Sequence, residues 1–485
     1  MRNDSKKVLI VILVIIISFV LFSNLSGYFI YQKSETICPD CNVIVIILDA
    51  LRPDHLGCYG YFRNTSPNID ELTKESILFK TAFSQSSHTL ASHMSIFTSQ
   101  YPSTHNIIEP LEDISLNPNT MTLTQILKMN DYTTVWIGPL YDENLDLKRG
   151  FERGFDYFFN IELEKKKTYY WKGAVDWIEE NENKKFFMFL YNFKIHDPYT
   201  PLMESVLKFT DMPNKKIISS DIELFNITTN KIISNPSIIF KDSVIKENQH
   251  LFSNKTLLRY SLPFLCKNYS NLHRNCFNLY EEMFWKNINL SDDSDINYIK
   301  LLYDSEIYEA DQDVKKLIDL LKREKLMDKT ILIITSDHGE EFMEHGRVDH
   351  GATLYDEVTH VPLIIWIPNV KGKEVSSLVQ GIDIMPTILD LIGIDSPKQV
   401  QGVSLLPLIE GGVKPLNKYI YTELFGYLAS IRSTNWKYIT NFKKIEELYN
   451  LDKDPIEKNN LIKTEPEIAE HMKNKLEDYF NEIIA

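Results

Sequence analysis

Four short runs of consecutive apolar residues recur along the chain, separated by longer segments that mix charged and apolar positions. The runs are NVIVIIL at Asn42–Leu48, FFMFLYNF at Phe186–Phe193, TILIIT at Thr330–Thr335 and VPLIIWI at Val361–Ile367. Unbroken rather than alternating apolar character is typical of strands that are covered on both faces. The pattern therefore predicts a mostly parallel sheet between two layers of helices.

Helical periodicity precedes the third run, where Asp304–Lys325 has the spacing of an amphipathic helix. Strands that alternate with helices predict a doubly wound α/β domain, in which ligands bind beyond the carboxyl ends of the strands. We assign a catalytic domain of this kind to residues 42–400.

Two regions depart from that alternation. Residues 205–300 are rich in Asn, Ser, Lys and aromatic residues, which predicts an insertion that folds over the domain as a lid. From Tyr419 onward, YIYTEL, SIRSTNWKYIT and EELYNL have the character of strands without intervening helices, and a helical segment follows them. They predict a small antiparallel sheet closed by one helix, an α+β subdomain that we place at residues 401–485.

The first part of the chain has the composition of a membrane segment. Val8–Ser23 is almost entirely apolar, and basic residues are more numerous before it than after it. About 20 apolar residues span a bilayer as a helix, and the excess of positive charge marks the cytoplasmic side. Residues 1–41 are therefore predicted to hold a transmembrane helix, with the rest of the chain outside the cytoplasm. The alternative is a cleaved signal peptide and a secreted protein.

Charge and cysteine content narrow the partners and the compartment. The net charge of −15 leaves no basic excess to neutralise phosphates, which argues against nucleic acid as a partner. Cys38 with Cys41, and Cys266 with Cys276, are spaced as possible disulfides of an oxidising compartment. Cys58 is left over and is expected to be buried.

Acidic residues and a histidine follow two of the predicted strands directly. Asp49 comes after the first run, and Asp337 and His338 come after the third. A divalent cation needs several oxygen or imidazole ligands, and strand ends that meet at one edge of a sheet can supply them. A single Asp at a strand end is often only a helix N-cap, so the prediction rests on the occurrence of both strand-end segments together.

Three longer segments around these residues resemble the sulfatase family. They are LDALRPDHLGCYGY, HTLASHMSIFTSQYPSTH and TSDHGEEFMEHGRVDHGATLYDEVTHVPLIIW, which begin at residues 48, 88 and 335. The resemblance implies an alkaline-phosphatase-like α/β fold with a smaller C-terminal subdomain, and a metal-dependent ester hydrolase. It also implies ligand roles for Asp49, Thr89, Asp337 and His338.

The segment TLASHMSIFTS departs from the family's pattern at the nucleophile. Sulfatases carry a Cys or Ser there, which is oxidised to formylglycine, whereas the matching position here is Thr89; His93 stands where an Arg is expected. Threonine cannot be converted to that aldehyde. A threonine phosphoester can still be resolved by in-line attack of water or an alcohol, so we expect phosphodiester or phosphoester chemistry, either hydrolysis or phosphotransfer.

The resemblance assigns further roles to three histidines. His196 matches a family histidine near the leaving group, and His350 occupies the place of a substrate-binding Lys. Either could protonate the leaving oxygen, since imidazole suits that task near neutral pH. His93 is expected to orient Thr89 or to bind the anion.

The sequence narrows the identity of the metal and of the substrate without fixing either. Ala50 replaces a second family acid, and His338 stands where Asn is usual. The ligand set is therefore expected to hold a single ion, with Mn²⁺ or Zn²⁺ favoured over Mg²⁺ or Ca²⁺. The expected substrate is a small-molecule, lipid head-group or glycan ester. Two alternatives remain: a sulfuric ester hydrolase that works without formylglycine, and a non-catalytic binding protein on the same fold.

Overall fold

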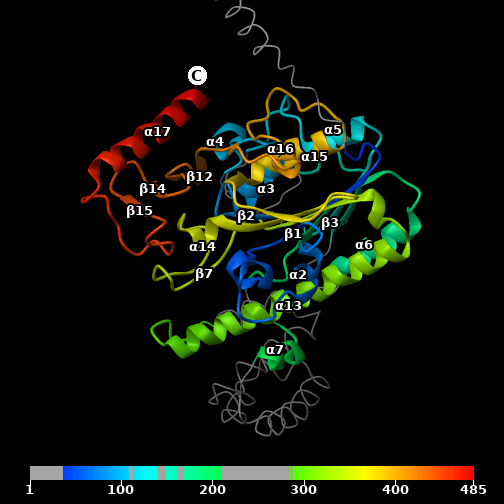
Figure 1. The fold of residues 1–485 in the computed structure, drawn as a ribbon, viewed down its shortest axis with the longest axis horizontal. Coiled ribbons are helices and arrows are strands. Elements are labelled where there is room, and N and C mark those ends of the chain that lie inside the picture. Colours follow the sequence, from blue (N-terminus) through cyan, green and yellow to red (C-terminus); the bar gives the residue numbers. More distant parts are fainter. Residues whose placement is uncertain are drawn as a thin grey trace, which may run out of the picture.

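The main body of the protein is a twisted sheet with helices on both faces (Figure 1). The computed structural model describes residues 37–108, 114–139, 149–160, 169–197, 199, 201–209, 285 and 288–484. Within these residues the sheet has nine strands, in the order β10-β2-β9-β6-β1-β5-β3-β4, with β11 also beside β2. The strands are β1 (Asn42–Leu48), β2 (Ile77–Phe83), β3 (Thr133–Gly138), β4 (Tyr157–Asn160), β5 (Phe186–Asn192), β6 (Thr330–Thr335), β9 (His360–Trp366), β10 (Lys373–Val375) and β11 (Val379–Gln380).

The central strand β1 explains why unbroken apolar runs form this sheet. All seven of its residues are buried, and it pairs in parallel with β5 on one side and β6 on the other. Ile44, Ile46 and Leu48 face one hydrophobic core, whereas the alternate residues face a second core across the sheet. The predicted doubly wound α/β architecture is confirmed, because both faces need apolar side chains.

Each core is closed by its own layer of helices (Figure 1). One layer contains α2 (Pro67–Thr73), α6 (Tyr169–Glu180) and α13 (Asp293–Arg323). The other contains α3 (Thr89–Thr98), α5 (Leu123–Met129), α15 (Ile384–Leu391) and α16 (Leu406–Ile409). The main body also contains the shorter helices α4 (Pro102–His105), α7 (Met203–Phe209) and α14 (Asp356–Thr359). Strand β7 (Glu341–Phe342) pairs with β8 (Val348–Asp349).

Two predicted elements differ from the structure in direction or length. Strand β9 pairs antiparallel with both β2 and β6, so the mostly parallel sheet that was predicted contains one antiparallel strand. Helix α13 begins at Asp293 rather than at Asp304, inside the segment assigned to the insertion. Its N-cap is Asp292, whose carboxylate accepts a hydrogen bond from the Ser294 amide, a polar start that hides the helix in the sequence pattern.

A second, antiparallel sheet follows the main body. The predicted segments form β12 (Ile420–Leu424), β13 (Leu428–Arg432), β14 (Trp436–Thr440) and β15 (Glu446–Asn450), in that spatial order. Helix α17 (Pro466–Ile484) packs on this sheet through Met472, Leu476 and Tyr479. Helix α16, by contrast, packs in the core of the main sheet, although it follows residue 401.

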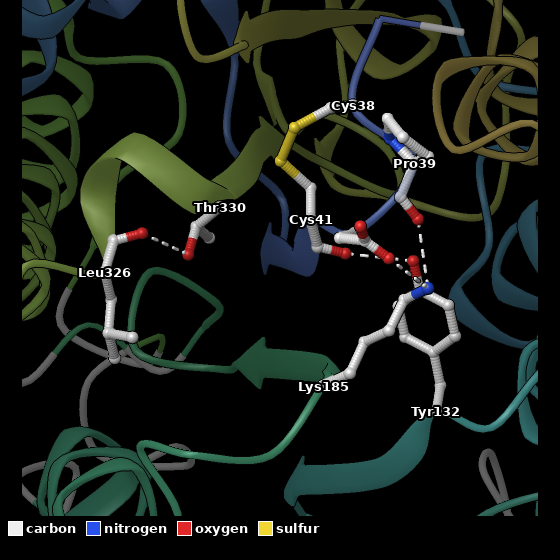
Figure 2. Close-up of a disulfide and its surroundings, with 8 residues drawn as sticks. Cys38, Pro39, Cys41, Tyr132, Lys185, Leu326 and Thr330 are labelled. Carbon is white, nitrogen blue, oxygen red and sulfur yellow. Dashed lines mark hydrogen bonds and ion pairs between the residues drawn. A yellow bond between two sulfur atoms is a disulfide. The ribbon is translucent and has the colours of Figure 1, made fainter.

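The chain enters the main sheet through a short disulfide loop (Figure 2). Cys38 and Cys41 are joined, as their spacing suggests, immediately before β1. The Tyr132 hydroxyl donates to the Cys41 carbonyl at 2.9 Å, and Lys185 lies over the Tyr132 ring. Cys58 is half-buried rather than buried and forms no disulfide in the described part of the chain.

Several predictions fall on residues that the structure does not describe. The predicted membrane segment lies within 1–36, and Cys266, Cys276 and the middle of the 205–300 insertion lie outside the described residues as well. Among the residues from Ile37 onward that are described, no helix is both long and apolar enough to cross a membrane.

Candidate active site

Four predicted ligand residues meet at the carboxyl ends of two neighbouring strands. Asp49 follows β1, Asp337 and His338 follow β6, and Thr89 is the first residue of α3. The Nε2 atom of His338 lies 3.6 Å from Asp49 Oδ1, 3.4 Å from Asp337 Oδ2 and 3.0 Å from Thr89 Oγ1. All four side chains are buried. The parallel pairing of β1 with β6 brings these distant segments together.

The donor atoms of this cluster fit a divalent cation. Asp49 Oδ1 and Asp337 Oδ2 are buried and have no hydrogen-bond partner among the described residues. The second oxygen of Asp49 accepts a hydrogen bond from the Tyr191 hydroxyl. The Nδ1 atom of His338 lies 3.0 Å from the Gly339 carbonyl, to which it donates, so Nε2 presents a lone pair to the carboxylates. Unpaired carboxylate oxygens in a dry pocket are costly unless a cation joins them.

The pKa shifts of the cluster are also those expected of a cation site. Burial raises the pKa of Asp49 well above its usual value, and the charge of Asp337 raises it further. Burial by itself would raise the pKa of Asp337 too, but His338, His93 and His350 hold it below its usual value. Burial lowers the pKa of His338 to about 3, so the ring is neutral near pH 7, as a metal ligand must be.

Ala50 takes the place of the second acid and adopts an unusual backbone conformation. Its φ is 58°, in the left-handed region that costs most residues with a Cβ atom about 1 kcal/mol. Neighbouring groups hold the turn: the Tyr303 hydroxyl donates to the Ala50 carbonyl at 2.7 Å, and the Leu51 amide donates to Ser336 Oγ at 3.0 Å. The turn directs Asp49 into the site without a second carboxylate.

Thr89 lies where a helix favours negative charge. Helix α3 begins at Thr89 with His88 as its N-cap, and the Ser92 amide makes the first bond of the helix, to the His88 carbonyl. The N–H groups ahead of Ser92 have no acceptor within the helix, and the helix dipole stabilises anions at this end. The oxygens of a bound ester can therefore be held beside the Thr89 hydroxyl.

His93 lies behind the ligand set rather than beside the Thr89 hydroxyl. Its Nδ1 atom donates to the Thr89 carbonyl at 3.0 Å and lies 3.5 Å from Asp337 Oδ2. The ring is fully buried and packs edge-on against Tyr191, 4.7 Å between centroids. This geometry suits the orientation of Thr89 and Asp337, and not direct contact with an anion.

The other two predicted histidines continue from His338 as a row of rings. His350 stacks on His338 with 4.1 Å between centroids, and His196 meets His350 edge-on at 4.8 Å. His196 in turn stacks on Phe193, and its Nδ1 atom donates to the Asp197 carbonyl. All the predicted site histidines therefore lie together.

Two acids around His350 were missed in the sequence. Its Nδ1 atom lies 3.1 Å from Glu340 Oε1 and 3.0 Å from Asp349 Oδ1, and the Tyr199 hydroxyl donates to Glu340 Oε2 at 3.0 Å. Burial alone would lower the pKa of His350, but Glu340 and Asp349 raise it well above its usual value. Both acids lie within the SDHGEE and RVDHGA segments, so their closeness to predicted site residues was the available signal.

His196 differs from His350 in protonation. Burial, together with the positive charge of His350, lowers the pKa of His196 to about 3. Near neutral pH His350 is therefore protonated, whereas the adjoining His196 is neutral.

Comparison with known proteins assigns the chain to a family. The Sulfatase family profile matches residues 41–394, and a profile for the C-terminal part of N-sulphoglucosamine sulphohydrolase matches 343–482. Human arylsulfatase K is 35% identical over 203 residues, covering 39% of this chain and 38% of that protein. The match to bovine arylsulfatase K likewise spans 40% of its length. An N-acetylglucosamine-6-O-sulfatase from Bacteroides thetaiotaomicron is 23% identical, covering 89% of this chain and 84% of that protein.

Two solved structures share the fold over nearly the whole chain. One is a protein solved in complex with its substrate D-glucosamine-2-N,6-O-disulfate. It superposes with a TM-score of 0.68 at 21% identity, covering 91% of this chain and 98% of that chain. The phosphonate monoester hydrolase of Agrobacterium radiobacter superposes with a TM-score of 0.68 at 18% identity, covering 91% and 96%. The family profile spans well over half of the sequence and all three segments that carry the predicted ligand residues. The chain belongs to the sulfatase family of ester hydrolases.

Proposed function

We propose that this protein is a metal-dependent phosphoester hydrolase or phosphotransferase that uses Thr89 as its nucleophile. The observation that carries the proposal is the position of the Thr89 hydroxyl, 3.0 Å from His338 Nε2 in the cluster that also contains Asp49 and Asp337. A hydroxyl at this point can share the ligand set and face an ester held at the N-terminus of α3.

The identity of the nucleophile favours phosphorus over sulfur. Threonine has no route to the formylglycine aldehyde, whose hydrate carries the second hydroxyl that expels sulfate in the family's usual chemistry. A phosphothreonine can instead be opened by in-line attack at phosphorus, by water or by an acceptor alcohol. The structural similarity to a phosphonate monoester hydrolase is compatible with this choice, because that protein's name describes phosphorus chemistry on the same fold.

Asp49, Thr89, Asp337 and His338 would hold one divalent cation, with Mn²⁺ or Zn²⁺ favoured by a mixed carboxylate, hydroxyl and imidazole set. Such an ion lowers the pKa of a hydroxyl and offsets charge on the attacked ester oxygen. Tyr191 and His93 fix the orientation of the two carboxylates through their contacts with Asp49 and Asp337.

The protonated His350 is the proton donor in this proposal. The Thr89 hydroxyl would first lose its proton to solvent. As the bond from the Thr89 oxygen to phosphorus forms, the bond to the leaving oxygen breaks and His350 gives that oxygen a proton. Glu340 and Asp349 keep His350 protonated and aligned. His196 is neutral and packs beside it, which supports the donor's position rather than the proton transfer.

The location of the protein is also part of the proposal. We place the catalytic domain outside the cytoplasm, held by the apolar N-terminal segment or released after its cleavage. The Cys38–Cys41 disulfide supports an oxidising compartment.

Turnover by matched Thr89 variants tests the proposal. The full chain, loaded with Mn²⁺ or Zn²⁺, is assayed on three substrates: bis(4-nitrophenyl) phosphate, the phosphonate monoester 4-nitrophenyl phenylphosphonate, and 4-nitrophenyl sulfate. Thr89→Val keeps the shape of the side chain and removes the hydroxyl, so kcat on the phosphodiester should fall by at least about 10³-fold. Thr89→Ser keeps the hydroxyl and should retain activity within about tenfold of wild type.

Three outcomes would contradict the proposal. Faster turnover of the sulfate ester than of both phosphorus substrates would favour the sulfuric ester hydrolase. No turnover with any of the metals would favour a binding protein. Full activity of Thr89→Val, with thermal unfolding unchanged, would remove Thr89 from the nucleophile role.

A further inference from the structure

A buried tyrosine on helix α13 holds the turn that follows the predicted ligand Asp49. The hydroxyl of Tyr303 donates to the Ala50 carbonyl at 2.7 Å and accepts a hydrogen bond from the Arg52 amide at 2.8 Å. Both of these turn residues are buried, as is Tyr303 itself. One hydroxyl therefore satisfies a buried backbone group on each side of Leu51.

The same turn is bonded to the segment that supplies the other predicted ligands. The Ala50 amide donates to Asp337 Oδ1 at 3.4 Å, and the Leu51 amide donates to Ser336 Oγ at 3.0 Å. The Ser336 hydroxyl in turn donates to the His338 carbonyl at 2.6 Å. The position of the turn thus sets where the ligands after β6 lie relative to the ligand after β1.

The backbone conformation of the turn makes this support necessary. Ala50 has a φ of 58°, in the left-handed region that is unfavourable for a residue with a Cβ atom. Without the Tyr303 hydroxyl, the Ala50 carbonyl and the Arg52 amide would each lose a partner in a buried setting, which is costly. We expect the turn then to relax toward a negative φ and to carry the adjoining Asp49 carboxylate with it.

We propose that Tyr303 is a positioning residue that sets the affinity of the Asp49, Asp337 and His338 cluster for its divalent cation. The inference rests on the metal-binding part of the proposed function and does not depend on which ester is cleaved. Tyr303 does not touch the cation and acts only through the turn. Loss of a group that orients metal ligands typically weakens metal binding by about 10- to 100-fold.

Titration of matched tyrosine variants with Mn²⁺ tests this role without any substrate. The full chain is stripped of metal with EDTA, dialysed and titrated by calorimetry. Tyr303→Phe keeps the ring and removes the hydroxyl, so the Kd for Mn²⁺ should rise by about 10- to 100-fold. Tyr59→Phe is the control, because the Tyr59 hydroxyl also donates to a backbone carbonyl, that of Phe79 at 2.8 Å, and accepts from a backbone amide, that of Leu363 at 3.0 Å.

The control separates positioning from stability. Each variant loses one hydroxyl and two hydrogen bonds to the backbone, so the midpoints of thermal unfolding without metal should fall by similar amounts. The Kd of Tyr59→Phe should nevertheless stay within about twofold of wild type. Ser336→Ala removes the hydroxyl that bonds the turn from the β6 side, and it should also weaken Mn²⁺ binding, so it serves as the test if Tyr303→Phe does not fold.

An unchanged Kd in folded Tyr303→Phe, or an equal rise in Tyr59→Phe, would overturn the role of Tyr303. If Tyr303→Phe is unfolded, wild-type affinity in Ser336→Ala would overturn it. A wild-type chain that binds neither Mn²⁺ nor Zn²⁺ would overturn it together with the metal site. Binding of Mn²⁺ without turnover of either phosphorus substrate would contradict the phosphoester proposal alone.

Discussion

His350 shows how single residues divide the chemistry of this site. Its ring stacks on His338, yet the two imidazoles differ in charge, because His338 faces two carboxylates through an unprotonated Nε2 whereas His350 is held by Glu340 and Asp349. Burial lowers the pKa of both rings. Glu340 and Asp349 more than offset it at His350, whereas at His338 the positive charge of His350 opposes the effect of Asp337. One ring can bind a cation while the other supplies a proton.

Leaving-group dependence tests the role of His350. His350→Gln should lower kcat/KM for an alkyl phosphodiester by about 10²-fold or more, because a poor leaving group needs a proton. For bis(4-nitrophenyl) phosphate, whose leaving group departs unprotonated, the loss should stay below about tenfold. Glu340→Gln should show the same pattern with smaller losses. Equal losses on both substrates would assign His350 to substrate binding instead.

At the scale of elements, a partly buried ion network joins α14 to the antiparallel sheet. Asp356 accepts two hydrogen bonds from Arg432 Nη1 at 2.7 Å and one from Lys437 Nζ at 2.9 Å. Burial by itself would raise the pKa of Asp356, but Arg432 and Lys437 hold it below its usual value. Since α14 immediately precedes β9, this network ties the second sheet to the main one.

Removing one partner of that network should be costly. Asp356→Asn should lower the free energy of unfolding at pH 7 by about 2 kcal/mol, because it leaves the partly buried Arg432 without its carboxylate, whereas Lys437 keeps Glu457 at 2.9 Å. Urea unfolding measures the loss. Asp452→Asn is the control, since Asp452 is exposed and bonds only Asn435 among the interactions described; it should change stability by less than about 0.5 kcal/mol.

The pH dependence of the same contribution has a definite sign. A carboxylate whose pKa is depressed in the folded state stabilises the fold above its unfolded pKa, near 3.9 for Asp. That stabilisation is lost as the pH falls through the lower folded value. The difference between wild type and Asp356→Asn should therefore shrink as the pH falls below about 4. A difference that grew on acidification would contradict the network.

At the scale of the whole molecule, the fold brings the predicted ligand residues together from three distant segments. A cation that binds only the folded chain must then stabilise it globally. At a hundredfold excess over Kd, Mn²⁺ should raise the free energy of unfolding by about 2.7 kcal/mol, and a chelator should reverse the gain. Thermal unfolding with and without EDTA measures the effect.

Two acid variants locate the ion. Asp337→Asn removes a predicted ligand and should abolish most of the shift caused by Mn²⁺. Asp349→Asn removes a carboxylate from the neighbouring Glu340, Asp349 and His350 cluster, and the shift should persist. The reverse result would place the cation in that second cluster.

Much of this arrangement follows from the sequence alone, for a local reason. The strands β1 and β6 begin and end as predicted, because unbroken apolar runs suit a strand with two buried faces. Asp49, Asp337 and His338 were placed from their position directly after those runs, and Thr89 and His93 from the resemblance of their segment to the family pattern. Parallel strands align their carboxyl ends, so the meeting of these residues needed little further information.

The remainder depends on contacts between segments far apart in the chain. The direction of β9 could not be read from its apolar residues, which are alike in parallel and antiparallel strands; the short β7–β8 hairpin and α14 connect it to β6 without a crossover helix. The charge of His350 is set by Glu340 and Asp349 through side-chain geometry. Phe425, in the turn between β12 and β13, packs against the His88 ring only because β12 is hydrogen-bonded to the segment before α3. Sequence periodicity determines which faces are buried, whereas tertiary packing decides which side chains face one another.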